Sequence, residues 1–577
     1  MLKACGDSTF RLGLGDEISP LVHGRVLRYK KELDSLKLDG IVEIVPAYNS
    51  LSIQYDPLVL DIERLKEILK NLSENEIEDQ NQAPGRLVRV PVCYDLGLDL
   101  DRVASHTGLD PKEIIRLHSE STYLVYMLGF MAGFAYLGGL DERLFTPRLD
   151  SPRARIEAGS VGLADKQTGI YPLASPAGWN ILGLTPLKLY DAHRREPILL
   201  RAGDRINFYA ISKEEFDFLK DQVERGLYKP EIEDSINDCE VREPSFSTVA
   251  KESQNDLKLM QDIKPPGIKV LKAGVFTSIQ DLGRLGLASQ GVPQCGVMDR
   301  YSTSLLNLLL KNDKNAAVIE MNLLGADYEF LVPTFFAIGG ALSDSYLNDE
   351  AIKPYCVYEA RLGDRLSIGR FITGSRAYLA VSGGVATRQA LGSRSTDTRL
   401  KLGGLGRKLE AGDLLPIGAA DSRLANLPKR HLKNWLLEEN LNRPLRVILG
   451  PQSDSFSREA IEDFLSSSYV ISPRSDRMGL RLEGRVIEHK GAADIITDGL
   501  AFGSIQVPKD GQPLILMADR QTSGGYPKIA CVISSDLPRL AQLPVNSQVR
   551  FEAIELEAAW DILRREAAFL RRLSIAL

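Results

Sequence analysis

A long polar stretch near the middle of the sequence, residues 228–266, divides the chain into two parts. It is rich in charged and small polar residues and ends at Pro265 and Pro266. A segment of this composition cannot bury enough apolar surface to build a core. A chain of 577 residues is also too long for one hydrophobic core, because single cores stop growing at about 250–300 residues. The sequence therefore predicts at least two globular parts, joined by a linker at residues 228–266.

The first part divides once more. Its beginning combines strand-like alternation with apolar residues at helical spacing, and the composition then turns polar before a Pro-Gly pair. We therefore expect a small α+β unit at residues 1–78. Residues 86–214 contain short apolar runs separated by Gly and Pro turns, with one helical pattern at residues 110–120. This pattern is typical of a β barrel or sandwich.

The second part, residues 267–577, repeats the alternation of strand-like runs and glycine turns. A polar, partly helical connector at residues 421–444 interrupts it, which indicates two β-barrel-like units. Residues 556–573 carry apolar side chains at i, i+3 and i+4 spacing and predict a terminal amphipathic helix. The predicted fold class is mainly β, with an α+β unit at the N-terminus.

A short internal repeat links the two parts. The string AGSVG at 158–162, followed by QTGIYP at 167–172, is similar to FGSIQ at 502–506, followed by QTSGGYP at 521–527. The repeat predicts a barrel shared by both parts, with about ten extra residues in a lengthened hairpin of the second copy. We expect the Gly-Ser turn at Ser160 to offer backbone N–H groups to an oxyanion, the alternative being a plain β-turn.

Composition excludes several classes of function. The net charge is −6 with no basic stripe, so a nucleic-acid partner is not expected. No apolar run reaches the roughly 18 residues of a membrane span, and the N-terminus lacks a secretory signal, so we expect a cytoplasmic protein that does not enter a membrane. Six scattered cysteines without a C-x-x-C pair, and histidines without metal-ligand spacing, predict free thiols and no metal site. The sequence also has no phosphate-binding G-x-x-x-x-G-K-[ST] loop and no G-x-G-x-x-G fingerprint after a strand.

Long motifs carry a resemblance to a known family. The run HSESTYLVYMLGFMAGFAYLGGLDERLFTPRLDSPRARIEAGSVGLADKQTGIYPLASPAGWNILGLTP resembles allophanate hydrolase subunit 1, the group of the 5-oxoprolinase B subunit. The strings QDLGRLGLASQGVPQCGVMD, GSRST, GGLGRKLEAGD, SDRMGLRLEG and TDGLAFGSIQVPKDGQPLILMADRQTSGGYPKIA resemble subunit 2 of the same pair, the group of the 5-oxoprolinase C subunit. Both runs are also similar to the carboxyltransferase region of urea carboxylase. The first run departs from the usual pattern at Ala132, Ala177 and Leu184.

The resemblance implies multiple cyclophilin-like β-barrel domains and a component of ATP-dependent 5-oxoprolinase. Such a component cleaves a cyclic amide, 5-oxo-L-proline, to L-glutamate together with a separate A subunit, and the complex uses ATP. One alternative is a biotin-dependent carboxyltransferase that acts on urea or a related amide. Its biotin would be carried on another protein, because no methionine here is followed by lysine. A second alternative is a regulatory inhibitor of a sensor histidine kinase. A homo-oligomer is also possible.

Lactam cleavage requires groups that bind a carboxylate, a developing oxyanion and phosphate, and groups that move protons. The expected catalytic residues are His118, Asp281 and Asp519. The alternative for His118 is a hydrogen-bonded structural histidine. The alternative for Arg148 and Arg153 is surface ion pairing. Arg477 can instead form a structural ion pair with Asp476, and a purely structural role is also the alternative for Asp299 and Glu320. We expect the main pocket in the second part, around the Gly-Gly turn that precedes Tyr526. The expected substrate-binding residues are Arg148, Arg153, Ser160, Gln167, Tyr171, Gln280, Arg284, Arg394, Arg477, Gln506, Gln521, Thr522 and Tyr526.

Overall fold

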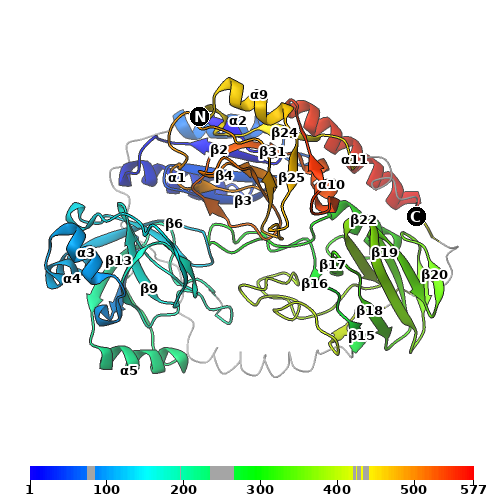
Figure 1. Ribbon diagram of the computed structural model, residues 1–577, viewed down its shortest axis with the longest axis horizontal. Coiled ribbons are helices and arrows are strands. Elements are labelled where there is room, and N and C mark those ends of the chain that lie inside the picture. Colours follow the sequence, from blue (N-terminus) through cyan, green and yellow to red (C-terminus); the bar gives the residue numbers. More distant parts are fainter. Residues whose placement is uncertain are drawn as a thin grey trace.

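The computed structural model describes residues 1–74, 85–194, 196–233, 266–419, 421, 424, 430–432 and 441–576. These residues form four β-rich bodies that lie side by side in an arch (Figure 1). The N-terminal unit and the C-terminal barrel make up the middle of the arch. The first barrel lies on one side of them and a large sheet on the other. The prediction of a mainly β protein with an α+β N-terminal unit is confirmed.

The N-terminal unit is a four-stranded antiparallel sheet with two helices. Ser19 caps the first helix by accepting a hydrogen bond from the N–H of Val22, and Pro20 occupies the first turn, where its missing N–H is not needed. Val26 and Leu33 of this helix are buried in the core of the unit. The strand order is β1 (Leu2–Ala4), β2 (Thr9–Gly13), β4 (Ser50–Tyr55), β3 (Ile41–Pro46), and the helices are α1 (Pro20–Ser35) and α2 (Ile62–Glu74).

The first barrel is an eight-stranded sheet that curls until β12, at one edge, meets the end of β5. Cys93, just after β5, exchanges backbone hydrogen bonds of 2.8 and 3.0 Å with Leu184 at the end of β12. The strand order is β12 (Asn180–Leu184), β9 (Ser160–Ala164), β10 (Gln167–Ile170), β7 (Ala135–Gly138), β6 (Thr122–Leu128), β13 (Arg205–Ala210), β5 (Leu87–Val92), β14 (Glu231–Glu233). Helices α3 (Leu100–Thr107), α4 (Pro111–Glu120) and α5 (Lys213–Glu224) and the small pair β8 (Arg153–Ile156) and β11 (Ser175–Ala177) complete this body.

A nine-stranded sheet opens the second part. Its centre is a long antiparallel pair, β19 (Thr334–Leu347) and β22 (Arg365–Val381), covered on one side by α7 (Arg300–Leu309). The other strands are β15 (Pro266–Lys272), β16 (Phe276–Gln280), β17 (Val318–Asn322), β18 (Asp327–Phe330), β20 (Glu350–Ile352), β21 (Tyr358–Ala360) and β23 (Leu414–Pro416).

The C-terminal barrel is again an eight-stranded sheet. Its strand order is β32 (Gln548–Val549), β25 (Tyr469–Ile471), β26 (Gly479–Glu483), β29 (Leu514–Leu516), β28 (Ser504–Gln506), β31 (Lys528–Val532), β24 (Leu445–Leu449), β33 (Phe551–Ala553). The small pair β27 (Asp498–Gly499) and β30 (Ser523–Gly524) and helices α9 (Arg458–Ser466), α10 (Leu537–Gln542) and α11 (Leu556–Ala576) belong to this body. The terminal helix is the one that the apolar spacing predicts.

The two barrels follow a common plan, as the first half of the internal repeat predicts. Each pairs its first strand in parallel with a late strand, β5 with β13 and β24 with β33. Gly159 and Gly503 precede the equivalent strands β9 and β28 with φ of +87° and +86°. The second half of the repeat is not equivalent, because Gln167 opens β10 whereas Gln521 follows the end of β29.

The two ends of the chain pack together. The Ser534 hydroxyl and N–H donate to the Asp7 carboxylate at 2.6 and 3.0 Å, and the Trp560 indole donates to the Asp7 carbonyl at 2.8 Å. Arg11 forms an ion pair of 2.8 Å with Asp498. The N-terminal unit is therefore bound to the C-terminal barrel through contacts between residues that lie more than 480 positions apart in sequence.

Two of the expected connecting segments fall largely outside the described residues. Residues 234–265 of the predicted linker are among them, and so is most of the connector at 421–444. The start of the predicted linker is a strand, because β14 pairs with β5 and extends the first barrel to residue 233.

The sequence also led us to expect no membrane span, no disulfide and no metal site. In the described parts of the chain no helix is long and apolar enough to cross a membrane. Five cysteines (Cys5, Cys93, Cys295, Cys356 and Cys531) are free thiols, and Cys239 lies outside these parts. Within the same parts no three His, Cys, Asp or Glu side chains come together as a metal site.

Candidate functional site

A cavity of about 770 Å³ lies between the two barrels, and we call it the inter-barrel cavity. The first barrel contributes the segments around β7, β10 and β11, and the C-terminal barrel contributes the segments around residues 494–497 and 521–526. It brings together five of the predicted site residues: Arg148, Gln167, Tyr171, Gln521 and Tyr526.

One wall of the inter-barrel cavity is aromatic. The rings of Phe134, Tyr171 and Trp179 meet edge to face, with centroids 5.0 to 6.0 Å apart. Burial raises the pKa of Tyr171 above its ordinary value and that of Tyr136 to about 12, so both phenols stay protonated near neutral pH. This wall offers an apolar aromatic surface that also carries phenol hydroxyl groups.

Polar and charged side chains also line the cavity. The exposed Arg148 forms an ion pair of 3.3 Å with Asp165, a weak interaction that a bound anion can replace. Gln167 donates 2.7 Å to the Tyr48 hydroxyl, which fixes its amide group. Lys509, at 3.2 Å from Asp494, adds a second cation. With Asp150 also in the lining, the charged groups of both signs suit a small polar molecule.

The two barrels approach each other closely at the edge of this cavity. The N–H of Phe130 donates 3.2 Å to the hydroxyl of Ser523. A Cβ on the neighbouring Gly129 would lie 1.9 Å from that oxygen, so only glycine permits the contact. Gly524 and Gly525 follow Ser523 and present backbone rather than side chains to the cavity.

A second cavity, of about 350 Å³, lies between the nine-stranded sheet and the C-terminal barrel, and we call it the arginine cavity. Two predicted site residues are found here: Arg477 bonds to Asp519 through Nε and a terminal nitrogen, at 3.0 and 3.1 Å. Arg477 also pairs with Glu320 and donates 2.6 Å to the Gly296 carbonyl. Burial raises the pKa of Asp519, although the Arg477 guanidinium opposes this shift.

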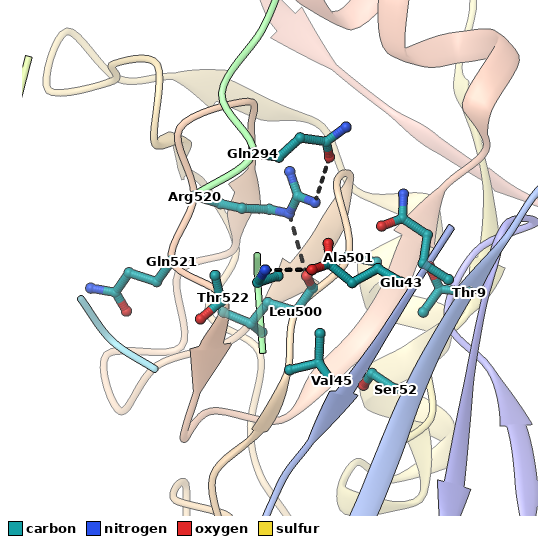
Figure 2. A pocket seen from close by; sticks show the side chains of 12 residues that line it. Thr9, Glu43, Val45, Ser52, Gln294, Leu500, Ala501, Arg520, Gln521 and Thr522 are labelled. Carbon is teal, nitrogen blue, oxygen red and sulfur yellow. Dashed lines mark hydrogen bonds between the residues drawn. The ribbon is translucent and has the colours of Figure 1, made fainter. Parts of the chain in front are cut away.

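A small enclosed space of about 30 Å³ lies behind Gln521 and Thr522 (Figure 2). Arg520 donates there to the Leu500 carbonyl at 3.3 Å and to the Gln294 side chain at 3.4 Å. Burial lowers the pKa of Arg520 to about 10 and raises that of Glu43. A space of this size holds about one water molecule, so it is not a substrate site.

The predicted catalytic role of His118 does not fit its position. Its ring is completely buried beside Phe208, and its two nitrogens lie 2.7 Å from the Tyr94 hydroxyl and 3.0 Å from the Thr168 hydroxyl. Burial lowers the pKa of His118 to about 3. It lines neither the inter-barrel cavity nor the arginine cavity, and these contacts are those of a structural histidine.

Three other predicted residues support a loop of the nine-stranded sheet. The Asp281 carboxylate accepts 2.6 Å bonds from the hydroxyls of Ser393 and Ser395 and from the N–H of Arg394. Arg284, also buried, donates to the carbonyls of Ala390 and Ser395. Gln280 donates to Ser278 and to the carbonyl of Thr396. These residues hold the 390–396 loop and lie outside both cavities.

The remaining predicted residues are spread over the surrounding structure. Arg153 makes a bidentate ion pair with Asp99, at 2.9 and 2.5 Å. The Ser160 hydroxyl donates 2.8 Å to the Glu157 carbonyl, which corresponds to a plain turn. The others lie as follows: Arg394 at a separate surface pocket, Gln506 bonded to the Tyr526 carbonyl at 3.1 Å, Thr522 at the small space, and Asp476 bonded to backbone N–H groups rather than to Arg477.

Comparison with known proteins assigns both parts of the chain. Residues 1–200 match the carboxyltransferase domain, subdomain C and D, and residues 290–553 match the carboxyltransferase domain, subdomain A and B. The chain is 36% identical over 308 residues to the 5-oxoprolinase C subunit of Escherichia coli (strain K12), covering 53% of this chain and 97% of that protein. It is 38% identical over 240 residues to the 5-oxoprolinase B subunit of Bacillus subtilis (strain 168), covering 38% of this chain and 97% of that protein. The chain belongs to this carboxyltransferase-domain family.

A solved structure supports the assignment to the carboxyltransferase-domain family over nearly the full length. The crystal structure of TTHA0988 has a TM-score of 0.78 at 32% sequence identity and covers 96% of this chain and 100% of its own. The order of the two matched parts, the B subunit before the C subunit, agrees with a fused protein.

Some residues of the inter-barrel cavity are not among those predicted. The aromatic residues Phe134 and Trp179 lie within the run that carries the family resemblance, so this run could have identified them as candidate site residues. One position where the chain departs from the family pattern, Ala177, also lines the cavity. Lys509 also lies within a string that carries the resemblance, whereas Asp494 lies just before that string, in a segment without any local sign of function. In the arginine cavity, Arg376 had no signal, because it is an isolated arginine in a strand.

Proposed function

We propose that this chain is the fused B and C component of an ATP-dependent 5-oxoprolinase, which cleaves 5-oxo-L-proline to L-glutamate together with a separate A subunit. The observation that carries the proposal is that one chain holds counterparts of nearly the whole of the B and C subunits, with a polar cavity between their barrels. A cavity built from both parts provides a physical reason for both to be present in one enzyme.

The groups around the inter-barrel cavity match the chemistry of this substrate. The Arg148 guanidinium is suited to bind the substrate carboxylate. The aromatic wall around Trp179 is suited to pack against the five-membered ring. The side-chain amides of Gln167 and Gln521 can pair with the lactam N–H and carbonyl.

The reaction must overcome the stability of the amide. ATP, used by the complex, makes the carbonyl electrophilic: the carbonyl oxygen takes the γ-phosphoryl group and ADP leaves. Water then adds to the activated carbon, the ring C–N bond breaks, and the nitrogen takes a proton. A second water releases phosphate from the resulting acyl phosphate. Backbone N–H groups at Gly524 and Gly525 are suited to stabilise the oxyanion that forms at the carbon.

The proposal is tested by mixing the purified chain with a purified homologue of the A subunit and measuring glutamate and ADP release. We expect both products from the mixture and neither from the separate proteins. Arg148→Met should raise the KM for 5-oxoproline at least about tenfold, because a charge-assisted contact to a carboxylate contributes more than about 1.4 kcal/mol. Arg155→Met is the matched control, since Arg155 is equally exposed and pairs with Glu157 at 3.4 Å outside the cavity. No product from the mixture, or equal KM values for both variants, would contradict the proposal.

A second candidate is carboxyl transfer, and the description of the matched family favours it. The inter-barrel cavity is larger than 5-oxoproline requires, and its aromatic wall and amide groups also suit the ureido ring of biotin carried on another protein. Incubation with free carboxybiotin and urea separates the two candidates. Carboxyl transfer without 5-oxoproline cleavage would favour the second.

A further inference from the structure

One hairpin of the N-terminal unit contacts both barrels. Its tip, residues 47–49, joins β3 to β4. The Tyr48 hydroxyl accepts a 2.7 Å hydrogen bond from Nε2 of Gln167 in the first barrel. Directly after the tip, the Ser50 hydroxyl donates a 2.8 Å hydrogen bond to Asp498 in the C-terminal barrel. The hairpin is therefore fixed at two points, one of which is a side chain of the inter-barrel cavity.

The surroundings of Tyr48 hold its ring in place. The residue is buried, and its ring centroid lies 5.1 Å from that of Tyr126 and 6.1 Å from that of Tyr136, both in the first barrel. Burial raises the pKa of Tyr48 well above its ordinary value, so the phenol stays neutral near neutral pH. Because a closely packed ring has little freedom to move, its hydroxyl is a fixed hydrogen-bond partner.

The phenol can act on the inter-barrel cavity only through the glutamine amide, because Gln167 lines the cavity and Tyr48 does not. A glutamine side chain has a carbonyl oxygen that accepts and an amino group that donates, and an unrestrained amide can rotate to present either group to a ligand. Here Nε2 is bound to Tyr48. Within the described residues no group donates to Oε1 of Gln167, so this oxygen is the acceptor left for a ligand.

An acceptor that is held in one orientation distinguishes between chemically similar ligands. An amide N–H donates to it, whereas the ring oxygen of a lactone in the same position would place two acceptors against each other. A site that is built to bind an N–H therefore rejects the analogue without this group, and it does so more strongly than an apolar pocket rejects a change of one methylene. This selection is lost if the amide is free to rotate.

We propose that Tyr48 is a positioning residue, which holds Oε1 of Gln167 for the N–H of a substrate amide, so that the inter-barrel cavity selects lactams over the corresponding lactones. The inference rests on the proposed function, because it concerns the substrate of the same cavity. It gives the N-terminal unit a part in recognition: this unit sets the orientation of one binding group without touching the ligand.

The lactone analogue of 5-oxoproline is a suitable probe, because a ring oxygen replaces the N–H with little change in size. Calorimetric titration of the full chain, without the A subunit and without ATP, gives the Kd of both compounds. We expect the wild type to bind the lactam more than about tenfold more tightly than the lactone. Tyr48→Phe removes the hydroxyl and keeps the ring. It should lower this preference at least about threefold, because the amide can then rotate and offer Nε2 to the ring oxygen.

Further variants test whether Tyr48 acts through Gln167. Gln167→Met should remove the preference, and adding Tyr48→Phe to it should have no further effect. Tyr55→Phe is the matched control and should keep the preference. Tyr55 belongs to the same unit and is equally buried, and its hydroxyl donates 3.2 Å to the Asp7 carbonyl, outside the cavity.

The inference is overturned if the wild type does not bind 5-oxoproline or does not prefer it to the lactone. It is also overturned if the preference survives Gln167→Met, or if Tyr48→Phe lowers it no more than Tyr55→Phe does. Gln167 is only half-buried, so its variant decides the matter even if Tyr48→Phe folds poorly. A wild type that shows the preference but gives no turnover with the A subunit homologue contradicts the proposed function alone. Turnover together with a preference that Tyr48→Phe leaves unchanged contradicts this inference alone.

Discussion

Asp519 and Gln521 are separated by a single residue, and they line two different cavities. Asp519 faces the arginine cavity and Gln521 the inter-barrel cavity. The intervening Arg520 points into the small space behind them (Figure 2). One short loop is therefore a wall of both the inter-barrel cavity and the arginine cavity, and a ligand that moves it in one cavity can alter the other.

Buried His118 should make the protein less stable in mild acid. Burial lowers its pKa to about 3, whereas an unfolded histidine has a pKa of about 6.5. Below about pH 6.5 the unfolded chain binds a proton that the folded chain does not. This stability is therefore present above that pH and decreases, by at most about 1.4 kcal/mol per pH unit, as the pH falls toward 3.

The variant His118→Gln tests this assignment. Its urea unfolding midpoint should change less between pH 6.5 and 4 than that of the wild type, and at pH 8 it should be lower because one buried hydrogen bond is lost. His106→Gln, at an exposed position on α3, should leave the pH profile unchanged. We also expect His118→Gln to retain turnover in the reconstituted assay. Loss of turnover with an unchanged pH profile would restore a catalytic role for the histidine.

The ion pair between Lys528 and Asp498 should be essential for attaching the N-terminal unit. The two groups are 2.9 Å apart and buried, and Asp498 also accepts bonds from Arg11 and Ser50 of the N-terminal unit. Burial by itself would raise the pKa of Asp498, but the Lys528 and Arg11 charges lower it below its ordinary value. The resulting stability is present above about pH 4 and is lost only as the pH falls further, through the lowered pKa.

Lys528→Met should destabilise the protein by about 3–5 kcal/mol at pH 7, because it leaves a buried carboxylate without its fully buried cation partner. Adding Asp498→Asn to this variant should restore part of the loss, and urea unfolding of the four proteins of the cycle measures the coupling. Lys509→Met is the control, since Lys509 is exposed and pairs with Asp494 at the surface. A Lys528→Met variant as stable as the wild type would mean that Arg11 alone neutralises Asp498.

The fold was predictable where local patterns decide it. Apolar spacing predicted α11 and α4, and the Gly-Ser repeat marked the same turn in both barrels. The packing of residue 7 against residues 534 and 560 was not predictable, because contacts over such sequence distances leave no local pattern.

The candidate site was predictable only in part, for a related reason. Glycine-rich family motifs pointed to Gln167 and Gln521, which do meet in one cavity. The same motifs pointed to Asp281 and Arg284, whose polar groups are used to support a loop. A sequence does not distinguish a charged residue that binds a ligand from one that binds its own backbone. Arg376, in a strand without a motif, could not be selected at all.

The two equivalent glycines should differ in how strictly they are required. Both have φ near +87°, where any other residue is strained, but a Cβ on Gly159 would lie 2.2 Å from the Thr185 carbonyl oxygen. A Cβ on Gly503 would first meet Leu537, at 2.9 Å, whose side chain can move. We expect Gly159→Ala to lower the free energy of unfolding by more than about 3 kcal/mol and Gly503→Ala to lower it by about 1–3 kcal/mol. Gly108→Ala is the matched control for backbone strain alone, because its φ is +72° and no atom lies within 4 Å of the added Cβ, so it should cost about 1 kcal/mol. Urea unfolding midpoints of the three variants measure the order, and a Gly159 variant no less stable than the Gly108 variant would show that β12 can shift to accommodate the methyl group.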